Sequence, residues 1–86
     1  MSNDTSQRIR SILQDHGRLG TPIAEIQDTT DLYQAGLTSH ASVSIMLAIE
    51  GEFGIEFPDE MLTRAVFSSI SAIRGAVEKL TGPDAA

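Results

Sequence analysis

The sequence lacks cysteine and tryptophan, has a single tyrosine, and contains no apolar run long enough to cross a bilayer. Without cysteine the chain can form no disulfide, no thiolate metal site and no cysteine nucleophile, and such a composition suits a cytoplasmic protein. The longest apolar stretch covers only residues 45–49, and the polar N-terminus does not resemble a signal peptide. We therefore expect no membrane association and a cytoplasmic location.

Positive charge is also scarce. Six Lys and Arg stand against twelve Asp and Glu, which gives a formal net charge of −6 at pH 7. Nucleic-acid binding needs clustered positive charge and is not expected, whereas basic partner surfaces would attract this chain. The two histidines, His16 and His40, lie far apart and have no metal-site spacing with the carboxylates. A chain of 86 residues has room for one domain but hardly for a deep catalytic cleft, so we do not expect an enzyme.

Apolar residues recur at helical spacing, and no segment alternates for long enough to form a strand. Main helices are expected over residues 5–16, 39–53 and 70–80, with a short third helix over residues 59–64. The predicted caps and stops are Asp4 and Gly17 for the first helix, Gly54 for the second, and Ser68 or Ser69 with Gly82-Pro83 for the last. The pattern predicts an all-α four-helix bundle forming one domain over residues 1–86, with its core within about 5–81 and a flexible tail at 82–86.

A long connection, residues 18–38, separates the first two helices. It mixes turn-forming residues with apolar ones, and a connection of this length in a small domain usually packs or has a function. We expect it to lie over the core, with a short helical turn at residues 31–34 capped by Asp31 or Thr30.

The second helix carries apolar residues on two sides. Ile45, Ile49 and Phe53 share one side at a spacing of four residues, and Val43 and Leu47 lie roughly opposite. The helix is therefore either buried nearly all round or exposes an apolar strip to partners, and the pattern leaves both open. The residues expected in the core are Ile9, Ile12, Leu13, Ile45, Ile49, Phe53, Ile70, Ile73 and Val77.

Two hydroxyls, on Thr38 and Ser39, stand where this helix begins. Ser and Thr most often act there as N-caps. An exposed serine beside free backbone N–H groups would instead suit a covalently attached phosphodiester, because a helix N-terminus favours an anion.

Three segments resemble the acyl and peptidyl carrier protein family. Residues 31–40, D-L-Y-Q-A-G-L-T-S-H, are similar to the family's D-L-x-x-x-G-x-D-S-L. Residues 50–60, E-G-E-F-G-I-E-F-P-D-E, resemble its E-x-x-F-x-x-x-I-P-D-E, and residues 67–70, F-S-S-I, resemble its entry to the last helix. The resemblance implies a carrier-protein-like four-helix bundle with 4′-phosphopantetheine attached to Ser39.

Two departures point to a subgroup. Thr38 stands where the family has Asp, His40 where it has Leu, and the ten residues after Ser39 hold no carboxylate. In these departures the chain resembles small stand-alone aminoacyl carrier proteins of bacteria. The resemblance implies loading by an amino acid:carrier protein ligase that is similar to the catalytic core of a seryl-tRNA synthetase.

The resulting hypothesis is a monomeric, non-enzymatic carrier that holds a small amino acid as a thioester. The implied partners are a phosphopantetheinyl transferase, the ligase or another loading enzyme, and a downstream acceptor enzyme. The residues expected to meet these partners are Thr38, His40, Val43, Leu47, Met61 and Arg64. Two alternatives remain: a fatty-acyl or polyketide carrier, and an unmodified helical adaptor in which Ser39 is only a cap.

Overall fold

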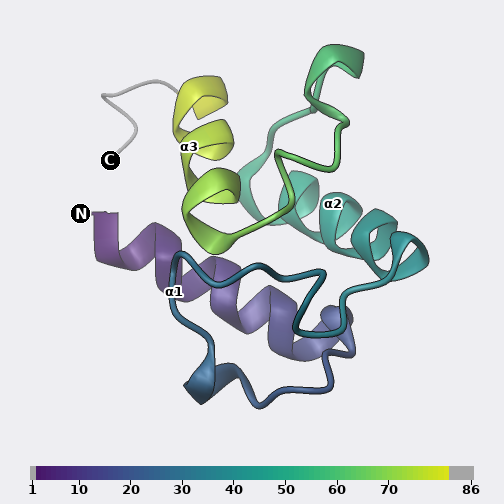
Figure 1. Ribbon diagram of the computed structural model, residues 1–86. Helices are drawn as coiled ribbons and strands as arrows, with labels where there is room; N and C mark the ends of the chain where they lie inside the picture. Colours follow the sequence, from purple (N-terminus) through teal and green to yellow (C-terminus); the bar gives the residue numbers. More distant parts are fainter. Residues whose placement is uncertain (1, 82–86) are drawn as a thin grey trace.

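The computed structural model describes residues 2–81, with side chains from residue 5 onward. The main helices are α1 (Ser2–Ile12), α2 (Ser39–Phe53) and α3 (Ile70–Thr81) (Figure 1). Shorter helical segments are η1 (Leu13–Gly17), a π-helical turn that continues α1, and the 3-10 turns η2 (Ile23–Glu25) and η3 (Asp59–Met61). No strand occurs in this part of the chain, so the all-α prediction is confirmed.

The hydrophobic core forms between α1 with its η1 extension, α2 and α3. The expected core residues that are buried are Ile9, Ile12, Leu13, Ile45, Ile49, Ile70, Ile73 and Val77. The assignment of Phe53 to the core was wrong. It is the last residue of α2 and only partly buried, and the guanidinium of Arg8 lies 4.7 Å from the centre of its ring. The connections add further core residues: Ile26, Leu32, Leu37, Phe57 and Phe67.

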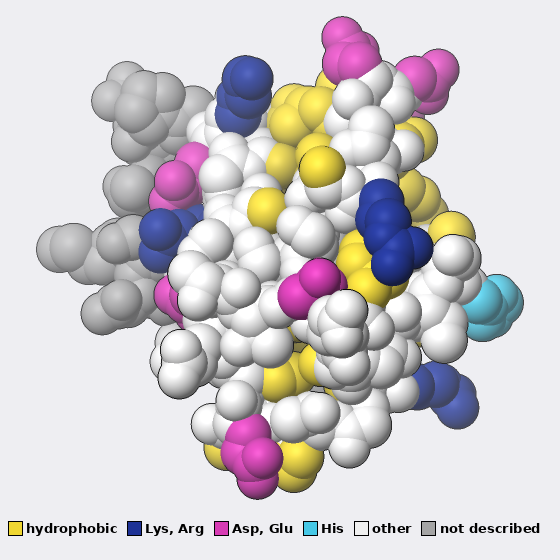
Figure 2. Space-filling view, in the orientation of Figure 1, with side chains coloured by type: hydrophobic (Ala, Val, Ile, Leu, Met, Phe, Trp, Pro, Cys, Tyr) yellow, Lys and Arg dark blue, Asp and Glu magenta, His cyan; other side chains and the backbone are white. Residues whose placement is uncertain are grey.

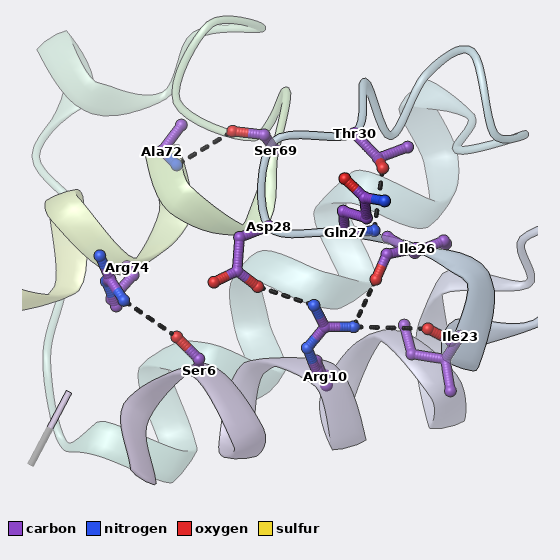
Figure 3. Close-up of polar contacts among 10 residues, drawn as sticks. All are labelled: Ser6, Arg10, Ile23, Ile26, Gln27, Asp28, Thr30, Ser69, Ala72 and Arg74. Atoms are coloured by element: carbon purple, nitrogen blue, oxygen red, sulfur yellow. Dashed lines mark hydrogen bonds and ion pairs between the residues drawn. The ribbon is translucent and has the colours of Figure 1, made fainter. Parts of the chain in front are cut away.

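The connection over residues 18–38 is tied to both α1 and α3. Arg10 of α1 donates hydrogen bonds to the carbonyl of Ile26 at 2.6 Å and to Oδ1 of Asp28 at 2.7 Å (Figure 3). The carbonyl of Asp28 in turn accepts from the N–H of Ser71 in α3 at 2.9 Å. The expectation that this segment packs over the core is confirmed, and its fixed course determines where α2 begins.

Replacing Arg10 with Met should lower the free energy of unfolding by roughly 1.5–3 kcal/mol, because it removes partly buried hydrogen bonds from a charged donor. Urea unfolding measures the loss, and amide exchange should show residues 26–37 losing protection. Arg8→Met is the matched control: its ion pair with Glu52 is 42% exposed on both side chains, so we expect a cost of about 0–1 kcal/mol. Equal losses in the two variants would contradict the role of Arg10.

The helix ends are partly as predicted. Both α2 and its stop are confirmed: Gly54 has φ 65° and ψ 39°, and its N–H donates to the carbonyl of Glu50. In α3, Oγ of Ser69 accepts from the N–H of Ala72 at 3.1 Å, which identifies Ser69 as the N-cap. The Gly82-Pro83 stop and the tail at 82–86 lie outside the described residues.

Two predicted ends of the first helix are wrong. The helix already begins at Ser2, so the backbone of Asp4 lies within the helix and not at its cap. At the other end Gly17 is still helical, and Arg18 takes the left-handed conformation with φ 51°. Gly17 is buried near Leu19 and Ile45, and a Cβ there would lie 3.5 Å and 3.6 Å from their side chains, an ordinary van der Waals contact, so neither packing nor the turn requires glycine at this position.

The short third helix predicted over residues 59–64 is shorter than expected. It ends at Met61, and Oγ1 of Thr63 accepts a hydrogen bond from the N–H of Val66, which starts a separate turn. This turn continues to Phe67, whose N–H donates to the carbonyl of Arg64. Within residues 2–81 none of the helices combines the length and the apolar character that crossing a bilayer requires.

Candidate functional site

The approach to α2 is a tight hydrogen-bonded turn. Oδ1 of Asp31 accepts from the N–H groups of Tyr33 at 2.9 Å and Gln34 at 3.3 Å, which confirms the predicted turn and its cap. Gly36 follows with φ 117°, and a Cβ there would lie 2.8 Å from the nitrogen of Gly20. Only glycine fits this crossing of the two chain segments.

Thr38 is the residue that caps α2. Its backbone is extended, with φ −95° and ψ 163°, and its Oγ1 accepts from the N–H of Ala41 at 3.0 Å. Its carbonyl accepts from the N–H of Ser42 at 2.9 Å. The geometry is that of an N-cap, so the capping function belongs to Thr38. The alternative in which Ser39 serves as the cap is wrong.

Ser39 is the first residue of α2, and its side chain is exposed. Among the described residues, none makes a hydrogen bond with its Oγ. The N–H groups of Ser39 and His40 belong to the first turn, where no carbonyl of the same helix can accept from them. A phosphate ester on this hydroxyl would therefore sit at the positive end of the helix dipole, beside free donors.

A groove of about 330 Å³ runs beside Ser39. One wall is formed by α2, and the other by the preceding turn and the segment after η3. Its remaining lining residues are Tyr33, Ser42, Val43, Met46, Leu62, Thr63, Arg64 and Phe67. The guanidinium carbon of Arg64 lies 4.0 Å from the centre of the Tyr33 ring, so the two side chains stack at the groove wall.

The outer face of α2 exposes the apolar strip. The side chains of Val43 and Leu47 are 52% and 58% exposed, whereas Ala41, Ile45 and Ile49 on the inner face are buried. The structure thus decides between the two possibilities that the sequence left open. Figure 2 shows hydrophobic side chains reaching the surface on the side where α2 and the connection to α3 lie. Such residues suit contact with partners.

The other expected contact residues are distributed unevenly around the site. His40 is exposed next to Ser39, and Arg64 lines the groove. Met61 is partly buried, packs against the core and is not among the lining residues of the groove. Leu62, which is 43% exposed, lines the groove one residue further along.

The sequence did not predict six of the lining residues: Tyr33, Ser42, Met46, Leu62, Thr63 and Phe67. The sequence places Met46 in a helix and Phe67 in a short motif. It does not indicate that the two side chains line the same groove. Among the residues that the structure describes, no group of three or more His, Cys, Asp or Glu side chains could hold a metal ion.

Comparison with known protein families agrees with this geometry. Residues 7–77 match the family model for the phosphopantetheine attachment site. The match covers most of the chain, and the chain belongs to this family of phosphopantetheine-bearing proteins. The exposed Ser39 hydroxyl at a helix N-terminus, which makes no hydrogen bond within the described residues, fits the cofactor, because a phosphodiester there needs a free oxygen and nearby N–H donors.

Two individual relatives show which kinds of carrier protein this chain is similar to. The chain is 53% identical over 79 residues to the aminoacyl carrier protein of Agrobacterium fabrum, covering 91% of this chain and 95% of the relative. It is 32% identical over 63 residues to the acyl carrier protein of Zymomonas mobilis, covering 72% and 78%.

A solved structure is similar over nearly the whole fold. The matching chain comes from the crystal structure of an engineered Bradyrhizobium japonicum glycine:[carrier protein] ligase complexed with carrier protein from Agrobacterium tumefaciens and ATP. The TM-score is 0.86 at 50% identity, covering 88% of this chain and 99% of that one.

Proposed function

We propose that this chain is an aminoacyl carrier: a single carrier domain whose Ser39 Oγ is the attachment point for phosphopantetheine. The observation that carries the proposal is the division of roles at the start of α2. Thr38 supplies the cap, which leaves the Ser39 hydroxyl exposed and without a hydrogen bond to any residue that the structure describes. The 53% identity to an aminoacyl carrier protein supports the amino acid as cargo.

The chain's own residues would hold and present the cofactor. Ser39 Oγ takes the phosphopantetheinyl group from coenzyme A, with release of adenosine 3′,5′-bisphosphate, and the first turn of α2 stabilises the new anion. When bound, the cofactor supplies a flexible arm whose thiol holds the aminoacyl group as a thioester. In this role the chain performs no catalysis, and it raises the effective concentration of the cargo at the enzyme on which it docks.

We further propose that enzymes dock on the surface around Ser39. The exposed strip of Val43 and Leu47 supports this, and so does the absence of acidic residues from the first turn of α2. Contacts there are then mainly apolar, with charge supplied from other parts of the surface. The proposed docking residues are Thr38, His40, Val43, Leu47, Met61 and Arg64.

The proposed partners are a phosphopantetheinyl transferase, an amino acid:carrier protein ligase and a downstream acceptor enzyme. The ligase is supported by the similar carrier structure, which is complexed with a glycine:[carrier protein] ligase and ATP. We place the carrier, as a monomer, in the cytoplasm, where an ATP-binding ligase would find its nucleotide.

The decisive test is an intact-mass measurement after incubation with coenzyme A and a promiscuous phosphopantetheinyl transferase. We expect a gain of one phosphopantetheine, and fragmentation of the modified peptide should place it on Ser39. No gain on folded protein, also with a transferase from the same source, would overturn the carrier proposal and favour the adaptor.

The cargo needs a second arm of the same experiment. The modified protein is offered glycine with ATP and an amino acid:carrier protein ligase, and separately malonyl-coenzyme A with a malonyl transferase. We expect aminoacylation and poor malonyl loading. Malonyl loading as good as that of a housekeeping acyl carrier would overturn the aminoacyl assignment and leave the attachment site intact.

A further inference from the structure

The groove beside Ser39 contains one formal charge. Of its lining residues, only Arg64 has a formally charged side chain, and the others are hydroxyl, apolar or aromatic side chains. The first turn of α2 contains no acidic residue either. An anion that entered this groove would therefore meet a cation and no competing carboxylate from the groove wall.

Within residues 5–81, Arg64 also has no ion-pair partner. In the described part of the chain Arg8 pairs with Glu52, Arg10 with Asp28 and Arg74 with Glu78. No carboxylate of residues 5–81 lies within ion-pair distance of Arg64.

The guanidinium of Arg64 is held in place instead by an aromatic ring. Its central carbon lies 4.0 Å from the ring centre of Tyr33. Both side chains line the same groove as Ser39, on the wall opposite α2. Stacking restricts the planar group and leaves its N–H donors at the edge available. The turn that carries Tyr33 is itself fixed by Oδ1 of Asp31, so the backbone that supports the ring is ordered without a ligand.

We infer that Arg64 positions the phosphodiester on Ser39, with Tyr33 as the support that orients the guanidinium. This inference rests on the proposed function. The modified serine would carry one negative charge, which matches the single cation of the groove, and an Arg–phosphate pair is a strong, directional contact. The pairing directs the attached end of the arm along the groove, and thereby limits the directions from which the thiol is presented.

The experiment compares unmodified and phosphopantetheinylated protein by NMR, in the wild type and in Arg64→Gln. Attachment should shift the Nε–H signal of Arg64. The shift should shrink from about 0.01 M to about 1 M salt, over which the Debye length falls from about 30 Å to about 3 Å. The phosphorus signal should be narrower in Arg64→Gln, because the arm moves more freely once its pairing is lost.

Two further variants make the result specific. Arg18→Gln removes the same charge from an exposed position outside the groove and should leave the phosphorus signal unchanged. Arg64→Lys keeps the charge but loses the planar stack, so it should restore the linewidth only in part.

The outcomes distinguish a failure of the positioning role of Arg64 from a failure of the proposed carrier function. No mass gain in any variant would overturn both. A normal mass gain with the same phosphorus linewidth in wild type and Arg64→Gln would overturn the positioning role alone. If Arg64→Gln raised the KM of the ligase with no change in the phosphorus signal, Arg64 would be contacting a partner instead, and the inference would be wrong.

Discussion

Replacing Ser39 with Ala is expected to abolish phosphopantetheine attachment and aminoacyl loading, and to leave the stability of the fold nearly unchanged. The loss should be complete because the variant lacks the oxygen to which the cofactor is bonded. Stability should hold because, in the described part of the chain, Ser39 Oγ makes no hydrogen bond and its side chain is exposed. Surface changes of this kind usually alter the free energy of unfolding by less than about 0.5 kcal/mol.

The neighbouring hydroxyl provides the matched control. Thr38→Ala removes the acceptor of the Ala41 N–H, so it should lower the free energy of unfolding by about 0.5–2 kcal/mol. Because Ser39 is intact, the variant should still gain one phosphopantetheine when the reaction runs to completion, and the loss of a proposed docking residue should lower only the rate. Urea unfolding and intact mass, measured on both variants, give opposite patterns if the roles are divided as described. Loss of loading in Thr38→Ala at a temperature where it is folded would contradict that division.

Local signals in the sequence were strong enough to predict α2 in full. A hydroxyl at its start and a glycine after its last residue define both ends, and the structure places them at Thr38 and Gly54. The length of the third helix was overestimated because Thr63 begins a separate turn. The Thr63 side chain accepts a hydrogen bond from the N–H of Val66, and apolar spacing does not reveal such a contact. Phe53 was misplaced because helical periodicity assigns it to the inner face without showing where the core ends.

The groove could not be predicted because it is a product of tertiary contacts. Tyr33 comes from the long connection, and Arg64 and Phe67 come from the segment before α3. Their approach depends on the hydrogen bond from the N–H of Leu32 to the carbonyl of Ser68, which joins these two connections at 2.7 Å. No spacing rule relates residues so far apart, whereas Ser39, the proposed attachment residue, belongs to one short motif that can be read from the sequence alone.

The largest stability effect is expected at Ile45, in the middle of α2. Its side chain is fully buried among the helices, so Ile45→Ala should lower the free energy of unfolding by about 2–5 kcal/mol through lost burial and a residual cavity. This loss is a large share of the total free energy of unfolding of a small domain, which is roughly 5–15 kcal/mol. Urea unfolding with a fixed slope measures the loss directly.

Leu47, two residues further along the same helix, separates stability from docking. Because its side chain is 58% exposed, Leu47→Ala should change the free energy of unfolding by less than about 0.5 kcal/mol. If the apolar strip meets the ligase, the variant should lose more than about 1 kcal/mol of docking energy, a rise in KM of roughly fivefold or more.

The kinetic comparison is made with fully phosphopantetheinylated protein, so that a defect in modification cannot imitate a defect in docking. A KM equal to that of the wild type would remove Leu47 from the docking surface. Its exposure would then be that of an ordinary surface residue, because scattered exposed apolar side chains are common on proteins without partners. A raised KM with unchanged stability would instead show that the two faces of α2 have separate functions, one for the core and one for partners.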